Sequence, residues 1–263
     1  FMTDGRGHVR IRADYAEDSS GILSGLIKYQ YRGATGGEWQ QLGTYDQRDN
    51  SGMRPLAIEA ESNSLFYTQK LNGRDALYRM ALDGSNKSEM VAKNEAVDID
   101  GVSRFGRGQK VIGYSYATDK REVVYFDREF DGLSTNLRKA IPNLPIISFS
   151  DSSSDGTKLL IFAGSDTNPG SYYFLDRKTK EMSPLFDARP ALAKRTLSPV
   201  KPVTYRAADG TSIPAYLTVP AGSTGKKLAA VVLPHGGPSS RDEWGFDWLA
   251  QFLAARGLSL IHI

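Results

Sequence analysis

From residue 1 to about residue 187, short runs of alternating apolar and polar residues are separated by clusters of Gly, Asp, Asn and Ser. The runs are rich in Tyr, Phe, Val and Ile, which favour strands with one buried face. The clearest runs occupy residues 64–68, 110–116 and 158–163, so their starts lie about 46 and 48 residues apart. This part of the chain therefore predicts β structure in repeated units.

A second strand-like run follows each of these at a similar offset, and an earlier unit precedes them. The second runs are residues 76–80, 122–127 and 171–176, and the earlier unit has runs at 27–31 and 39–42. A period of 40 to 50 residues with three or four short strands is typical of a β-propeller blade. We predict a partial β-propeller of about three to four blades over residues 1–187.

Two local patterns interrupt the strand runs. In residues 130–140, Leu133, Leu137 and Ala140 have helical spacing and Pro142 follows, which predicts a short helix between blades. Residues 152–156 end in Asp-Gly, whose backbones tolerate the left-handed region, so we expect a hairpin turn there.

Residues 188–202 contain several prolines, which cannot donate a backbone hydrogen bond to a sheet, and the strand pattern stops there. We interpret this segment as a linker. Two strand runs joined by a turn come next, at residues 203–207 and 213–219. A continuous apolar run at 228–233 suits a strand buried on both faces of a largely parallel sheet. Residues 241–255 then predict an amphipathic helix that packs on that sheet, followed by Gly257 and a last strand. The apolar residues mostly on one side of this helix are Trp244, Trp248, Leu249, Phe252 and Leu253.

Between the buried strand and the predicted helix stand His235, Gly236 and Gly237. Glycines let the backbone turn sharply and bring an amide N–H close to a developing negative oxygen, as in the oxyanion hole of α/β-hydrolases. The alternative is that the glycines form only a tight turn and that His235 is a polar residue at a strand end.

Four segments together resemble the start of the catalytic domain of the prolyl oligopeptidase family of serine peptidases: residues 203–210, 213–217, 234–238 and 251–257. The histidine at 235 makes the resemblance closer to the acylaminoacyl-peptidase and dipeptidyl-peptidase-like branch than to the oligopeptidase type, which has tyrosine there. It covers about 65 residues strongly. The last residues, 257–263, depart from the family pattern.

The resemblance implies a multi-domain β plus α/β protein, with a partial β-propeller (1–187) followed by a truncated α/β-hydrolase domain (203–263). It also implies that the Gly237 N–H is the first oxyanion donor, that His235 and Gly236 shape the loop, and that the second donor follows the nucleophile.

Arg241 and Asp242 are candidates for contact with substrate at the mouth of this site, although a solvated helix start explains both residues as well. An Asp near a helix N-terminus is stabilised by the helix dipole without any function. Trp244 is interpreted as a core residue.

No Gly-x-Ser-x-Gly motif occurs; residues 21–25 have their serine in the wrong place. The only histidines are His8, His235 and His262, and none stands where a triad base belongs. We therefore expect the Ser-His-Asp triad downstream of this chain, and we expect the chain alone to be inactive.

Composition narrows the function classes further. Apolar residues make up 40% and charged residues 24%, and the net charge of +3 has no clustered basic patch, so neither disorder nor nucleic-acid binding is indicated. The absence of cysteine excludes disulfides and a cysteine nucleophile, and no ligand spacing predicts a metal or other cofactor. The longest apolar run is far shorter than the roughly 20 residues of a membrane span.

The first five residues lack a signal-peptide pattern and look like a start inside a longer protein. Cytoplasmic and, with a signal peptide upstream, periplasmic or secreted locations both remain open.

The leading hypothesis is a fragment of a serine peptidase that hydrolyses short peptides. Two alternatives remain: an esterase with the same loop, and a propeller interaction module with a non-catalytic hydrolase remnant.

Overall fold

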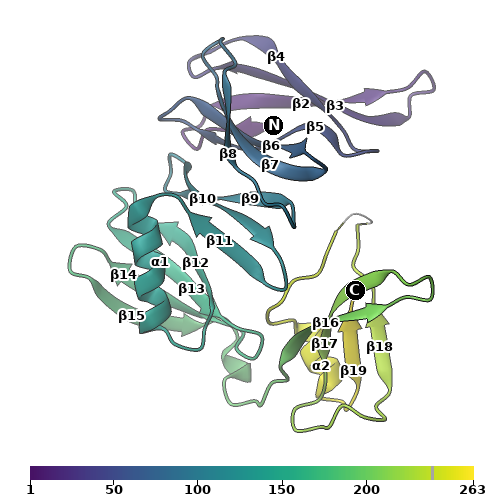
Figure 1. Ribbon diagram of the computed structural model, residues 1–263. Coiled ribbons are helices and arrows are strands. Elements are labelled where there is room, and N and C mark those ends of the chain that lie inside the picture. The colour runs from purple at the N-terminus through teal and green to yellow at the C-terminus, as the bar shows by residue number, and fades with distance from the viewer. Residues whose placement is uncertain (238–239) are drawn as a thin grey trace. The chain divides into compact units, whose positions relative to one another are not determined.

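The computed structural model describes residues 1–237 and 240–263 and consists mainly of antiparallel β-sheet (Figure 1). It divides into two compact units, one of Phe1–Thr118 with Glu122–Asp131 and one of Asp119–Arg121 with Gly132–Ile263. No helix in the described part of the chain is long and apolar enough to cross a membrane.

The first unit begins with eight antiparallel strands paired in sequence order. These are β1 (Met2–Thr3), β2 (Val9–Glu17), β3 (Leu23–Gly33), β4 (Gly36–Asp46), β5 (Ser51–Glu59), β6 (Ser64–Leu71), β7 (Arg74–Ala81) and β8 (Ser88–Ala92). β4 and β5 pair close to the turn that joins them, with Tyr45 opposite Gly52 and Asp46 opposite Ser51. A three-stranded sheet of order β11-β10-β9 follows, made of β9 (Ile99–Phe105), β10 (Lys110–Ala117) and β11 (Arg121–Tyr125).

The core of the first unit lies on both faces of β6. Leu65 and Tyr67 pack into one apolar cluster, whereas Phe66 packs into another, because successive side chains of a strand point to opposite faces. Three alternate residues in the middle of β3 reach the first cluster: Ile27, Tyr29 and Tyr31. The apolar positions that alternate in the sequence are therefore the buried positions of these strands.

The second unit contains a four-stranded antiparallel sheet, again in sequence order. Its strands are β12 (Ile146–Ser152), β13 (Lys158–Gly164), β14 (Ser171–Asp176) and β15 (Glu181–Asp187). Leu159, Ile161 and Ala163 alternate into its core. The predicted hairpin turn is confirmed between β12 and β13, where Gly156 has φ of 68° and the Asp155 carboxylate accepts the Thr157 N–H at 3.1 Å.

The predicted strand runs of the first 187 residues are confirmed, each lying within or largely within a strand of the structure. The predicted helix at 130–140 is also confirmed, as α1 (Arg128–Ala140) between β11 and β12. The Asp127 side chain accepts the Glu129 N–H at 3.0 Å just before this helix, and Phe130 and Leu137 are buried.

After a short 3-10 turn (Pro190–Leu192), the second unit continues with a four-stranded sheet of order β16-β17-β19-β18. Its elements are β16 (Val200–Arg206), β17 (Ser212–Thr218), β18 (Ala230–Leu233), α2 (Trp248–Ala254) and β19 (Ser259–His262). The predicted β16–β17 hairpin and the last strand are confirmed.

The prediction that the strand at 228–233 is buried on both faces is wrong. β18 stands at the edge of its sheet, and Val232 is 57% exposed. The helix α2 packs mainly on β19 and β17, and in β18 Ala230 and Val232 are exposed whereas Val231 and Leu233 are half-buried.

The prediction of a helix over 241–255 is also wrong in length and orientation. α2 begins only after Asp247, whose side chain accepts the Ala250 N–H at 2.6 Å and caps the helix. Its buried side chains are those of Ala250, Gln251 and Ala254. Of the side chains expected to pack on the sheet, Leu249 and Leu253 are half-buried, whereas Trp248 and Phe252 are 60% and 49% exposed.

Candidate functional site

The loop that follows β18 lies at the carboxyl end of a parallel strand pair. β18 pairs in parallel with β19, from Ala230 opposite Ser259 to Leu233 opposite His262. α2 lies between these two strands in the chain, which gives the strand, loop, helix, strand order of an α/β unit. In such sheets, ligands bind beyond the carboxyl ends of the strands.

The parallel ladder continues one step into the loop. Ile263 N–H donates to Leu233 O at 3.1 Å, and His235 N–H donates to Ile263 O at 3.0 Å. The His235 ring is placed by Nδ1, which lies 3.0 Å from Gly236 O and donates to it. The backbone of the loop is therefore fixed as far as His235.

The two glycines come directly after this fixed point and are both exposed. Gly237 has φ of 139°, in a region that residues with a Cβ rarely adopt, so the backbone itself requires glycine there. A Cβ added at Gly236 would meet nothing within 4 Å. The structure brings His235, Gly236 and Gly237 together as one exposed turn, and Pro238 of the same motif lies outside the described residues.

Arg241 and Asp242 do not lie at a helix start, because α2 begins only at Trp248. The Arg241 Nη2 group donates to the Tyr216 hydroxyl at 3.1 Å. The Oδ2 atom of Asp242 is buried and has no hydrogen-bond partner among the described residues. The interpretation of this pair as a solvated helix start is therefore wrong.

Trp244 is half-buried, as expected of a packing residue. Its indole Nε1–H donates to Val200 O at 2.8 Å, and Lys120 Nζ lies 3.7 Å from its ring centroid. Neighbouring Glu243 forms a two-pronged ion pair with Arg121, in which Nε donates to Oε2 at 2.8 Å.

Sequence reasoning missed the contacts that Tyr216, Lys120 and Arg121 make with residues 241–244. Tyr216 was visible only as one apolar position of a strand. Arg121 and Glu243 stand 122 positions apart in the sequence, and no local pattern could connect them.

The other two histidines have ionic partners of their own. His262 is buried in β19, with Nε2 4.0 Å from an oxygen of Asp247. His8 belongs to the first unit, where Nδ1 lies 3.0 Å from an Asp4 oxygen.

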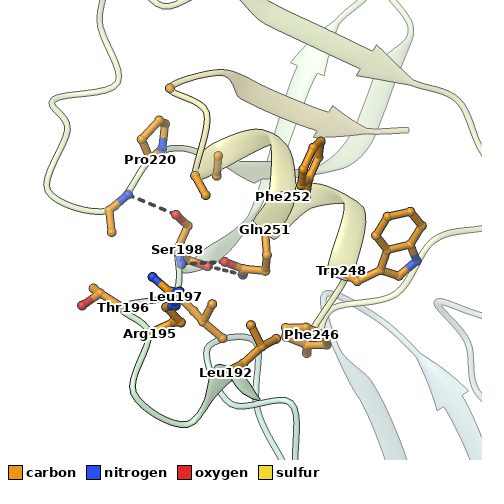
Figure 2. A pocket seen from close by; sticks show the side chains of 14 residues that line it. Leu192, Arg195, Thr196, Leu197, Ser198, Pro220, Phe246, Trp248, Gln251 and Phe252 are labelled. Carbon is orange, nitrogen blue, oxygen red and sulfur yellow. Dashed lines mark hydrogen bonds between the residues drawn. The ribbon is translucent and has the colours of Figure 1, made fainter. Parts of the chain in front are cut away.

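A cavity of about 870 Å³ lies beside α2, and it is not lined by the predicted site residues. Its walls are largely apolar, with Leu192, Phe246, Trp248 and Phe252, as Figure 2 shows. Inside it, Gln251 points to Ser198 and makes two hydrogen bonds to its backbone.

No family model matches the chain. It is 28% identical over 246 residues to dipeptidyl aminopeptidase BIII of Pseudoxanthomonas mexicana, an alignment that covers 88% of this chain and 34% of that protein. It is 23% identical to dipeptidyl peptidase family member 6 of Caenorhabditis elegans, over 100% of this chain and 38% of that one. The chain thus spans little more than a third of these relatives.

Solved structures share the fold. A puromycin hydrolase superposes with a TM-score of 0.61 at 16% identity, covering 96% of this chain and 39% of that one. The acylaminoacyl peptidase of Pyrococcus horikoshii superposes with a TM-score of 0.55 at 15% identity, covering 96% and 38%.

In the described residues, antiparallel sheets are followed by the mixed sheet of β16, β17, β19 and β18, with a glycine loop after β18 and the helix α2 before β19. The chain is thus similar in sequence to two dipeptidyl peptidases and similar in fold to acylaminoacyl peptidase and puromycin hydrolase structures.

Proposed function

We propose that the protein to which this chain belongs hydrolyses short peptides by acyl transfer to a serine, and that His235, Gly236 and Gly237 supply half of its oxyanion hole. The observation that carries the proposal is the place of the two glycines. They are exposed at the carboxyl end of β18, immediately after the last ladder bond at His235.

In this proposal the Gly237 N–H donates to the oxygen that becomes negative in the tetrahedral intermediate. A fixed backbone dipole aimed at that charge stabilises the transition state more than the ground state. The positive φ of Gly237 sets the angle between the peptide groups before and after this residue. The hydrogen bond from the His235 ring to Gly236 O holds the peptide group that carries the Gly237 N–H. The second donor comes from the residue after the nucleophile.

The nucleophile, acid and base of the triad are proposed to come from outside these 263 residues, because the sequence has no Gly-x-Ser-x-Gly motif. Arg241 and Asp242 remain candidates for the substrate side, since both stand shortly after the loop.

The sheets of residues 1–187 are proposed to be blades of a β-propeller that restricts the active site to short peptides, with 188–202 as linker and 203–263 as the opening of the hydrolase domain. In support, residues 1–187 form antiparallel sheets of eight, three and four strands, and in each sheet neighbouring strands follow one another in the sequence. A peptide as the ligand class is supported by the puromycin hydrolase, one structure of which is a complex with PGG.

The test uses a dipeptidyl chromogenic substrate, a matched ester and a fluorophosphonate probe that labels activated serines. We expect the parent protein to cleave the peptide and take the label, and the 263-residue chain to do neither. Turnover by the purified chain would overturn the placement of the triad. Cleavage of the ester alone by the parent would favour the esterase, and no labelling at all would favour the non-catalytic module.

The loop is tested separately with Gly237→Val in the parent. Loss of one oxyanion donor lowers kcat by about 100- to 1000-fold. The control is Gly210→Ala in the β16–β17 turn, where an added Cβ meets nothing within 4 Å and kcat should stay within about twofold.

A further inference from the structure

The turn between β10 and β11 provides three consecutive residues, Asp119, Lys120 and Arg121, that fall within the second compact unit. Each contacts another part of that unit. The Tyr216 hydroxyl donates to Asp119 O at 2.9 Å, Lys120 Nζ lies over the Trp244 ring, and Arg121 pairs with Glu243. A single turn therefore contacts both the sheet and the segment before α2.

The segment it contacts, residues 240–247, contains neither helix nor strand. Without ladder bonds, the position of such a backbone depends on its side chains. Arg241 is bonded to the Tyr216 hydroxyl at 3.1 Å, and Trp244 donates to Val200 O at 2.8 Å. Tyr216 is only 7% exposed and thus links Arg241 to Asp119 through one buried hydroxyl.

We propose that the turn 119–121 is a latch that holds residues 240–247 and thereby positions the exposed glycines, Gly236 and Gly237. Arg121 and Glu243 are its main positioning residues. The part that concerns oxyanion geometry rests on the proposed function, whereas the latch itself does not.

The glycine turn lies between two anchored residues. At one end His235 N–H donates to Ile263 O, which ties the loop to the sheet. At the other end stands Arg241, four residues after Gly237 and so within about 14 Å of chain. Glycine has more backbone freedom than any other residue, so two glycines between these ends keep one conformation only if both ends stay in place.

The Arg121–Glu243 pair suits this task because of its geometry. A planar guanidinium that meets a carboxylate with two parallel N–H groups fixes orientation as well as distance. Both side chains are about one-third to two-fifths exposed, at 35% and 42%. Salt therefore reaches the pair, and we expect the latch to weaken as ionic strength rises.

The test is hydrogen–deuterium exchange of the 263-residue chain, read on peptides that cover residues 234–247. Arg121→Ala and Glu243→Ala should each accelerate exchange there by about three- to tenfold. Trypsin should also cleave after Arg241 faster in Glu243→Ala than in the unchanged chain. The charge swap, Arg121→Glu with Glu243→Arg, should restore most of the protection.

The matched control is Arg48→Ala, which removes the arginine of an exposed Arg48–Asp46 ion pair in the first unit. It should leave exchange of residues 234–247 unchanged. Equal acceleration in this control, no acceleration in either latch variant, or a swap that restores nothing would overturn the latch. Hydrogen exchange needs no substrate, so it tests the latch independently of catalysis. If the exchange results agree with the latch but the parent protein cleaves no peptide, the proposed function is refuted and the latch is not.

Discussion

The side-chain amide of Gln251 pairs with the backbone of Ser198 on both sides: Oε1 accepts the Ser198 N–H at 2.8 Å, and Nε2 donates to Ser198 O at 2.8 Å. The same Nε2 also reaches Asp166 O at 3.3 Å. Gln251 is 6% exposed and Ser198 is 4% exposed, so neither backbone group can turn to water instead. One glutamine thus joins α2 to the segment that enters β16.

Replacing Gln251 should lower the stability of the folded chain. Gln251→Leu keeps the volume but leaves a buried N–H and a buried C=O of Ser198 unpaired, which we expect to lower the free energy of unfolding by about 2–4 kcal/mol. Urea unfolding followed by tryptophan fluorescence measures it. Phe252→Ser, on the exposed side of the same helix, is the control and should cost less than about 1 kcal/mol. Equal midpoints for the two variants would refute this account of Gln251.

The start of α2 depends on Asp247, which caps it through the Ala250 N–H. Asp247→Ala should lower the free energy of unfolding by about 1 kcal/mol, because one backbone N–H of the first turn loses its partner. Asp247→Asn keeps a side-chain oxygen at the same position and should retain most of the stability. Thermal unfolding by circular dichroism compares the two; an alanine variant as stable as the asparagine variant would contradict the capping role.

Asp4 should make the first unit sensitive to acid. Burial acts to raise the pKa of its carboxyl, but hydrogen bonds from the Arg6 and His8 N–H groups and from the His8 ring outweigh burial, and the pKa is lowered. A lowered folded-state pKa contributes stability above the unfolded value near pH 4, and this contribution is lost as pH falls through the folded value.

Asp4→Asn should therefore destabilise the chain by roughly 1 kcal/mol at pH 7, and the difference from the unchanged chain should shrink below about pH 4. Urea midpoints measured from pH 7 to pH 3 test this. A difference that is constant across that range would show that the charge of Asp4 contributes nothing.

Gly170 should tolerate no side chain. Its φ is 106°, and an added Cβ would lie 2.1 Å from the Phe162 ring, between β13 and β14. Gly170→Ala should therefore cost about 2–4 kcal/mol, from backbone strain together with the displaced ring. Gly210→Ala has a similar positive φ of 85° but open space, and should cost about 1 kcal/mol. Urea unfolding of both variants separates steric overlap from backbone strain, and equal losses would contradict the overlap.

Much of the β structure was determined by the sequence alone, because its signals are local. Alternation places Leu159, Ile161 and Ala163 on one face of β13, whichever strands pair with it. The turn at Asp155-Gly156 is stabilised within itself, by the hydrogen bond from the Thr157 N–H to the Asp155 carboxylate. The short helix before Pro142 and the two glycines after β18 are local signals of the same kind.

Only the tertiary structure decided which surfaces are covered. Periodicity showed that Trp248 and Phe252 share a face of a helix, but α2 buries the opposite face, which carries Ala250, Gln251 and Ala254. Small side chains allow close packing of the helix on β19 and β17, and the buried backbone of Ser198 needs the amide of Gln251 as its hydrogen-bond partner. In the same way, β18 reads as a fully buried strand but stands at a sheet edge. The loop was visible in the sequence, whereas the contact of Arg121 with Glu243 arises only when folding brings together residues 122 positions apart.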